Sequence, residues 1–84
     1  MSEADVSDQV ALTIPQMGVV EEVVVIEWLV EEGSTVSEGQ EVVVIETEKA
    51  EVALEAPSAG TIRIVVEPSD YEVPVGTTLA YINP

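Results

Sequence analysis

Short runs of apolar residues, most of them β-branched, alternate along the chain with turn-forming glycine, proline, serine and acidic residues. Runs of this length and composition are typical of strands, and no stretch repeats its apolar residues with a helical period. Strands are therefore expected at residues 10–14, 23–30, 42–45, 51–55, 61–67 and 78–82, with a shorter one at Val36. The pattern predicts an all-β protein.

The pattern of the first half of the chain returns in the second half at an offset of 37 residues. The offset places glycine on glycine and apolar on apolar residues, as in the pairs Gly39 and Gly76, Val36 and Val73, Val42 and Leu79, Ile45 and Ile82, and Val25 and Ile62. Such a match is typical of a duplicated β unit. Two halves that close on each other would bury the apolar face of each. Trp28, Tyr71 and Tyr81 are expected in or near this core.

The chain is long enough for one small domain. Residues 1–9 are small, polar and acidic and are expected to form a disordered leader, so the domain would span residues 10–84. The leader lacks the basic and apolar segments of a signal peptide, and no run approaches the roughly 20 apolar residues of a membrane span. A soluble protein of the cytoplasm, or of the mitochondrial matrix in a eukaryote, is expected.

The composition excludes several kinds of active site. The chain has no cysteine and no histidine, which rules out thiolate metal sites and both serine-histidine-aspartate and cysteine-histidine catalysis. The acidic pairs Glu21-Glu22 and Glu31-Glu32 lack the ligand spacing of a calcium loop. We therefore expect no metal site, and we do not expect this chain by itself to be an enzyme.

The charge balance is strongly acidic. Seventeen aspartates and glutamates stand against only Lys49 and Arg63, for a formal net charge of −15. Nucleic acid and anionic membranes attract clustered lysine and arginine and would repel such a chain. The acidity keeps the domain soluble and favours basic partner surfaces, although a merely solvated surface explains it equally well.

The segment Glu46-Thr47-Glu48-Lys49-Ala50 contains the only lysine of the chain and lies between two expected strands. A strand, a short polar turn and a second strand would display Lys49 at the tip of a hairpin. The turn lacks the Asn-Gly or Asp-Gly pair of the tightest hairpins, so its conformation is left open. The 37-residue repeat places both chain ends away from this tip. An inert, solvated lysine on a structural β-module is the alternative.

The chain resembles the lipoyl domains of 2-oxo acid dehydrogenase acyltransferases, within the biotinyl/lipoyl carrier family, over about residues 10–82. The resemblance is carried by an ordered series of segments: Pro15-Gln16-Met17-Gly18, Trp28, Glu32-Gly33-Ser34-Thr35-Val36, Glu38-Gly39-Gln40, Ile45-Glu46-Thr47-Glu48-Lys49-Ala50, Ala56-Pro57-Ser58-Ala59-Gly60-Thr61-Ile62 and Val73-Pro74-Val75-Gly76-Thr77-Thr78-Leu79-Ala80-Tyr81-Ile82. It implies a flattened β-barrel of two four-stranded antiparallel sheets related by a pseudo-twofold axis.

The resemblance also implies that Lys49 carries lipoic acid in amide linkage and acts as a swinging arm for acyl groups and reducing equivalents. Glu46, Thr47, Glu48 and Ala50 would form the recognition hairpin around it. Biotin carriers of the family have methionine on both sides of the lysine, so Glu48 and Ala50 favour lipoyl over biotin. A biotin carboxyl carrier domain is the alternative. The family's usual aspartate before the lysine is replaced here by Glu48.

The partners that the resemblance implies are those of a 2-oxo acid dehydrogenase complex. They are the 2-oxo acid dehydrogenase, the dihydrolipoyl acyltransferase core, dihydrolipoyl dehydrogenase, and a lipoate ligase or lipoyl transferase; the domain itself is expected to be monomeric. One departure concerns partner choice, because Glu22-Val23 occupies the place of the family's usual Glu-Gly pair and the loop after Gly18 is one residue shorter.

Overall fold

The computed structural model describes residues 8–84, and its regular elements are eight strands. They are β1 (Val10–Thr13), β2 (Glu22–Trp28), β3 (Thr35–Val36), β4 (Glu41–Glu46), β5 (Glu51–Glu55), β6 (Gly60–Ile64), β7 (Glu72–Pro74) and β8 (Thr78–Asn83). No helix in the described part of the chain is long and apolar enough to cross a membrane. The leader expected at residues 1–9 falls largely on residues 1–7, which lie outside the described residues.

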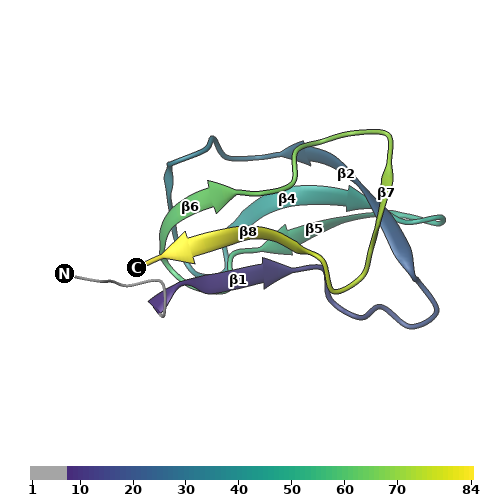
Figure 1. Ribbon diagram of the computed structural model, residues 1–84, viewed down its shortest axis with the longest axis horizontal. Coiled ribbons are helices and arrows are strands. Elements are labelled where there is room, and N and C mark those ends of the chain that lie inside the picture. The colour runs from purple at the N-terminus through teal and green to yellow at the C-terminus, as the bar shows by residue number, and fades with distance from the viewer. Residues whose placement is uncertain (1–7) are drawn as a thin grey trace.

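The strands form two four-stranded sheets, with the orders β1-β8-β6-β3 and β5-β4-β2-β7 (Figure 1). Every pairing is antiparallel. This arrangement confirms the all-β class and the two antiparallel sheets implied by the resemblance. Closing the two sheets on each other buries one face of each, as a sheet with a single apolar face requires.

The 37-residue repeat is confirmed by the strand pairing. Val25 lies opposite Ile45 in one sheet, and Ile62 lies opposite Ile82 in the other, each residue being displaced by the same offset. The same offset maps β2 onto β6, β4 onto β8 and β3 onto β7. The order β7-β2-β4 in one sheet therefore corresponds to the order β3-β6-β8 in the other. The two halves therefore supply equivalent strands to equivalent places, in agreement with the pseudo-twofold axis that the resemblance implies.

The interior between the sheets is aliphatic. Its buried side chains are Leu12, Ile14, Val23, Val25, Val36, Val42, Val43, Ile45, Leu54, Ala56, Ile62, Leu79, Ala80 and Ile82, and no described polar or charged residue is buried with them. Full burial of one valine, leucine or isoleucine side chain contributes roughly 1.5 to 3 kcal/mol. Since the chain has no cysteine, this packing takes the place of the disulfides that often stabilise small domains.

Two strands end at least two residues earlier than the apolar runs predict. β2 ends at Trp28 rather than at Val30, after a bulge between Val25 and Glu27, and Leu29 is already 45% exposed. A bulge places two residues of one strand opposite one of its partner and increases the local twist. The chain therefore leaves the sheet before the apolar run is complete.

β6 ends at Ile64, although the run was expected to continue to Glu67. The carbonyl of Leu79 accepts hydrogen bonds from both Val65 N (2.8 Å) and Val66 N (3.2 Å), so the regular ladder stops there. The indole Nε1 of Trp28 donates to the carbonyl of Val66 at 2.9 Å. Half-buried Trp28 thus ties the end of β2 to the segment that follows β6, as a residue packed beside the core should.

The tyrosines differ from the expectation of core positions. Tyr71 is 81% exposed, because it lies in the turn before the short edge strand β7, where no second layer covers it. Tyr81 is 37% exposed, since it alternates with Ala80 and Ile82, which are fully buried, and so faces outward from β8. The prediction is wrong for Tyr71, and Tyr81 lies on the outer face of its sheet.

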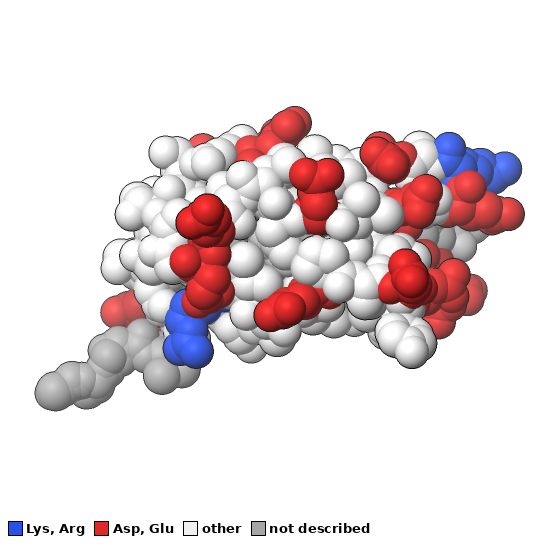
Figure 2. All heavy atoms as spheres, turned by 90° about the horizontal axis from the view of Figure 1, so that it is seen from above, with Lys and Arg blue, Asp and Glu red and all other residues white. Residues whose placement is uncertain are grey.

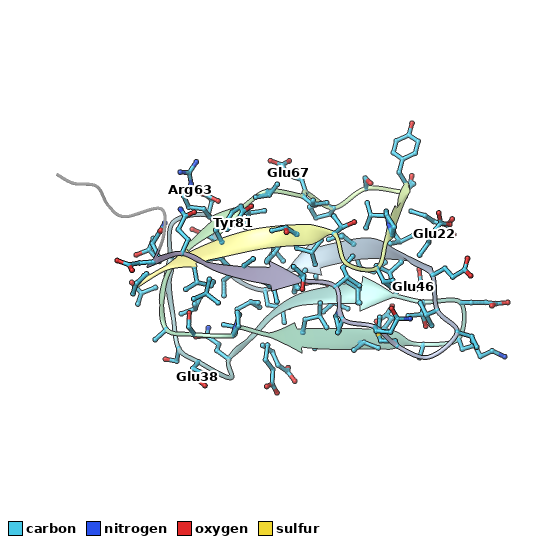
Figure 3. All side chains as sticks on the ribbon, turned by 60° about the horizontal axis from the view of Figure 1, so that its bottom comes forward. Glu22, Glu38, Glu46, Arg63, Glu67 and Tyr81 are labelled. Atoms are coloured by element: carbon cyan, nitrogen blue, oxygen red, sulfur yellow. The ribbon has the colours of Figure 1, made fainter. Side chains whose placement is uncertain are left out.

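The charges of the strands are divided between the two sheets. All seven strand glutamates belong to the β5-β4-β2-β7 sheet: Glu22, Glu27, Glu41, Glu46, Glu51, Glu55 and Glu72. The strands of the other sheet have no acidic residue and contain Arg63. The two basic side chains lie at opposite ends of the molecule (Figure 2), and Arg63 and Tyr81 lie far from Glu22 and Glu46 (Figure 3).

Candidate functional site

Lys49 lies in the connection between β4 and β5, which projects from one end of the two sheets (Figure 1). The β4–β5 ladder continues to Glu46 and Glu51, the last pair before the turn. β4 is an inner strand with partners on both sides, and its Ile45 is fully buried. A well-anchored strand pair therefore supports the tip that the sequence predicts. The start of β1 and the end of β8 lie at the other end of the domain, also as predicted.

The turn from Thr47 to Ala50 is closed by the side chain of Thr47. Thr47 N donates to the carbonyl of Ala50 at 2.8 Å, and the Thr47 hydroxyl donates to the same carbonyl at 3.0 Å. The hydroxyl oxygen accepts from Lys49 N at 3.3 Å and from Ala50 N at 3.1 Å. No described residue other than glycine has a positive φ, so this is not the type I′ turn of an Asn-Gly hairpin.

The structure brings the five residues of the expected site together at this tip. Glu46, Glu48, Lys49 and Ala50 are exposed and Thr47 is half-buried. The long stem of Lys49 begins on the turn itself, so the ammonium group can reach outward without displacing the core. An exposed amine on a rigid base is accessible to a macromolecular partner, as a modification site must be.

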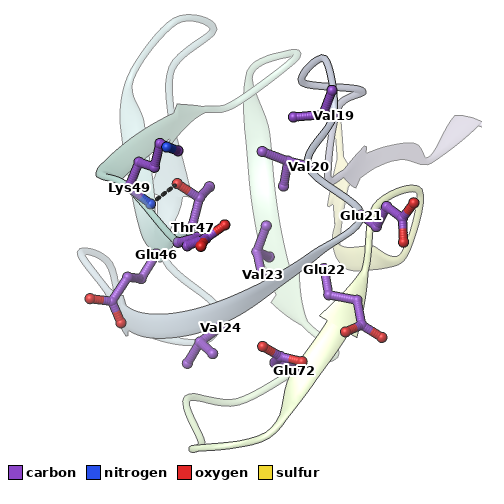
Figure 4. Close-up of a pocket in the computed structure, with 11 residues that line it drawn as sticks. Val19, Val20, Glu21, Glu22, Val23, Val24, Glu46, Thr47, Lys49 and Glu72 are labelled. Carbon is purple, nitrogen blue, oxygen red and sulfur yellow. Dashed lines mark hydrogen bonds between the residues drawn. The ribbon is translucent and has the colours of Figure 1, made fainter.

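A shallow groove of about 620 Å³ lies beside Lys49, between the hairpin and the segment that follows Gly18 (Figure 4). Its lining combines valines with carboxylates: Val19, Val20, Glu21, Glu22, Val23, Val24, Glu46, Thr47, Glu48, Lys49 and Glu72. Val19 is 94% exposed, unlike the core valines. That Val19, Val20 and Glu72 lie beside the lysine could not be predicted from the sequence. Their proximity depends on how β7 and the loop after β1 pack at the end of the domain that carries Lys49.

A line of acidic residues crosses the sheet just below the turn. Glu51 pairs with Glu46, Glu46 with Val24, and Val24 with Glu72. We call Glu46, Glu51 and Glu72 the acidic row. The positions equivalent to Glu46, Val24 and Glu72 in the other sheet are Asn83, Thr61 and Thr35, which are paired in the same way and carry no charge. Of these two equivalent sets of positions, only the set beside Lys49 carries carboxylates.

Glu22 and Glu72 form a carboxyl pair on the outer face of β2 and β7. A hydrogen bond that the protonated Glu22 carboxyl donates to the Glu72 carboxylate, followed by repulsion from the Glu72 charge, raises the pKa of the Glu22 carboxyl above its usual value. Like charges on neighbouring strands favour retention of a proton by one of them. Within residues 8–84 no three or more carboxylates are arranged to hold a metal ion.

Comparisons with known proteins find relatives over nearly the whole described domain. A family model described as "Biotin-requiring enzyme", with the short name Biotin_lipoyl, matches residues 10–82. A dihydrolipoyllysine-residue acetyltransferase component of the acetoin cleaving system from Pseudomonas putida is 39% identical over 72 residues, which are 84% of this chain and 20% of that protein.

A protein of the same description from Cupriavidus necator is 34% identical over 76 residues, which are 89% of this chain and 20% of that protein. The chain thus spans about a fifth of the length of the curated relatives that it matches. The matched region includes the whole hairpin with Lys49.

Proposed function

This chain belongs to the biotin/lipoyl attachment-domain family, and from that premise we propose that Lys49 carries lipoic acid in amide linkage. The domain has the function of a lipoyl carrier, and the proposal concerns which residue holds the group and what the group is. The observation that carries it is the placement of the only lysine of the chain, exposed at the tip of a hairpin on two ordered strands.

The residues of the tip fit such a group. Lys49 offers a primary amine on a flexible four-carbon stem, and the flanking Glu48 and Ala50 are exposed and do not crowd it. Lys49 is exposed, and Arg63 lies at the opposite end of the molecule, so within residues 8–84 neither desolvation nor a basic neighbour activates the lysine as a nucleophile. The ligase must therefore supply both the activated acyl donor and the base that removes the proton. Amide formation then removes the positive charge.

The contribution of the domain is presentation. When bound, the lipoyl dithiolane supplies reversible disulfide–dithiol redox chemistry and holds an acyl group as a thioester. The β4–β5 hairpin holds the root of that arm at one end, while the start of β1 and the end of β8 lie at the other end, so a linker attached there would not obstruct it. We propose that the domain catalyses no step itself, since its described residues form no nucleophile–base pair.

Lipoic acid is favoured over biotin by two observations. Glu48 and Ala50 flank the lysine where the resemblance places methionines in biotin carriers. Both relatives reported above are dihydrolipoyllysine-residue proteins by name. Biotin attachment is therefore the less favoured alternative, and an unmodified structural module is the third.

The partners proposed for the loaded domain follow from the same relatives, which are components of acetoin cleaving systems. We propose that a dehydrogenase of a 2-oxo acid or acetoin type loads the arm, that an acyltransferase core receives the acyl group, and that dihydrolipoyl dehydrogenase reoxidises the dithiol. The acidic row and Glu48 would favour partner surfaces that are basic around the site entrance, because opposite potentials steer association.

The test is the intact mass of the purified domain after incubation with ATP, lipoate and a lipoate ligase, with biotin and a biotin ligase in parallel. We expect one lipoyl addition to the wild-type domain, none to Lys49→Arg, and no biotin addition. Because the amino terminus is the only other amine, the arginine variant assigns the site. A biotin addition would move the domain to carboxylases, and no addition to a folded domain would support the structural module.

A further inference from the structure

The hairpin turn that carries Lys49 depends on one hydroxyl group. We propose that Thr47 is a positioning residue for the modification of Lys49: its hydroxyl fixes the turn in the geometry that the modifying ligase requires. This inference rests on the function proposed above and concerns a residue that does not itself react. Thr47 acts through the backbone of Lys49 and Ala50.

The hydroxyl of Thr47 uses its full hydrogen-bonding capacity within the turn. A hydroxyl has one donor and two acceptor lone pairs. The donor is directed to the carbonyl of Ala50 at 3.0 Å, and the two acceptor positions are taken by Lys49 N at 3.3 Å and Ala50 N at 3.1 Å. One side chain therefore connects both ends of the turn and binds the amide of the modified residue (Figure 4).

The backbone of this turn needs such support. The two-residue turns that best match the twist of paired strands have positive φ at their central residues. Here the central residues Glu48 and Lys49 do not have positive φ, and Ala50 N bonds to the Thr47 side chain. Without the hydroxyl, the amides of Lys49 and Ala50 would lose their protein partner and bond to water, and the tip would sample several conformations.

The position of the turn matters because it determines where the lysine amine meets the acyl donor. The ligase holds an activated acyl group at a fixed place, and the lysine amine must reach it in line with the acyl carbon. Misplacement of a reacting group by about 1 Å can cost on the order of a hundredfold in rate. Because the lysine stem is flexible, its attachment point on the turn is the part that the domain can fix.

The experiment compares three variants of the unmodified domain with the wild type. Thr47→Val removes the hydroxyl and keeps the shape, Thr47→Ser keeps the hydroxyl, and Thr77→Val is the matched control. The Thr77 hydroxyl also closes a turn, by donating to the carbonyl of Pro74 at 2.6 Å, but it lies outside the Lys49 hairpin. Each variant is tested for kcat and KM with a lipoate ligase and for amide hydrogen exchange by NMR.

We expect Thr47→Val to lower kcat/KM at least about fivefold, because each lost hydrogen bond contributes about 1 kcal/mol. Amide exchange should accelerate at Lys49 and Ala50 while the buried amides of β4 stay protected. Thr47→Ser should remain within about twofold of the wild type, and Thr77→Val should leave both measurements at the hairpin unchanged.

The inference is overturned if Thr47→Val is modified at the wild-type rate while its domain remains folded. It is equally overturned if Thr47→Ser is as slow as Thr47→Val, since the hydroxyl would then not be the cause. An equally slow Thr77→Val would also overturn it, because the loss would not be specific to the Lys49 hairpin. If the Thr47→Val domain is unfolded, the test rests on the modification rate of Thr47→Ser and on amide exchange at the tip of the hairpin. Failure of the wild type to be modified would instead refute the proposed function.

Discussion

Glu46 and Asn83 occupy equivalent positions in the two halves of the fold, 37 residues apart, at the ends of β4 and β8. Glu46 pairs with Val24 beside the lysine turn, and Asn83 pairs with Thr61 at the opposite end of the domain. The same backbone framework thus carries a carboxylate at one end and a neutral amide at the other. The acidic character of the lysine end is therefore a property of particular side chains and is not imposed by the fold.

The first prediction concerns this acidic end. The double substitution Glu46→Gln and Glu51→Gln removes two of these carboxylates. It should slow the loading of the lipoylated domain by its partner dehydrogenase up to about tenfold at low salt, because charge complementarity acts mainly on the rate of association. Stopped-flow or steady-state loading rates at several salt concentrations would measure the effect. The double variant should also show a weaker dependence on salt.

The matched control for that experiment neutralises Glu27 and Glu55, which lie in the same sheet away from the tip. It removes the same amount of charge and should leave the loading rate within about twofold of the wild type. Equal slowing by both double variants would show that net charge alone matters and would refute a role for the lysine end.

The second prediction concerns the close approach of β6 to the chain end. Gly60 has a φ of +151°, and a Cβ at this position would collide with the backbone carbonyl of Asn83. Gly60→Ala should therefore destabilise the domain by roughly 3 kcal/mol or more, measured as the free energy of unfolding in urea. Gly39→Ala is the control, since its φ is +87° and a Cβ there meets no atom within 4 Å; it should cost only about 1 kcal/mol.

The third prediction concerns the pKa of Glu22. The Glu72 side chain raises this pKa, so the folded state holds more protons than the unfolded state as the pH rises above 4.5, the usual value. The contribution of the pair to stability is then present at low pH and is lost as the pH rises through the raised pKa. Glu72→Gln should return the pKa of Glu22 toward its usual value and raise the melting temperature at pH 7.

Carboxyl carbon shifts of Glu22, followed by NMR from about pH 2.5 to pH 7, would measure the change in pKa directly. The melting temperatures of the wild type and Glu72→Gln should converge at the acid end of this range, where both carboxyls are protonated. A Glu22 titration that is the same in both proteins would contradict the assigned cause. Glu67→Gln, in the segment after β6, serves as the charge-matched control.

The fourth prediction concerns the contact between Trp28 and the segment after β6. Trp28→Phe keeps an aromatic ring against the core but removes the donor to the Val66 carbonyl. The substitution should cost about 1 kcal/mol in the free energy of unfolding, the usual contribution of one hydrogen bond. Faster amide exchange near Val66, with the β4–β5 ladder unaffected, would place the loss there. No change in either measurement would contradict this role.

Much of the fold could be predicted from the sequence because the main constraints are local and repeated. The β-branched runs define most strands, and the glycines and apolar residues matched at 37 positions reveal the duplication. Lys49 could be identified because it is the only lysine and lies between two such runs. In β6, Ile62 faces the core between exposed Thr61 and Arg63, as alternation along the strand predicts.

The remaining features depend on contacts between distant segments. The early end of β6 requires two amides, Val65 N and Val66 N, to share the carbonyl of Leu79, which no run of residues reveals. Tyr71 is exposed because the short strand that follows it lies at a sheet edge. The placement of Glu72 near Glu46 depends on the registers of β2 with two partners. The role of the Thr47 hydroxyl likewise required the geometry of the turn.

The most direct test of the central claim is a tryptic map of the protein isolated from its own cells. Trypsin cleaves after lysine and arginine, and the chain offers only Lys49 and Arg63. A lipoyl amide on Lys49 blocks the first site, so we expect a peptide that ends at Arg63 and contains an uncleaved Lys49 with the added lipoyl mass. Cleavage after Lys49, which would release the peptide 50–63, or a biotin mass on the peptide that contains Lys49, would contradict the account.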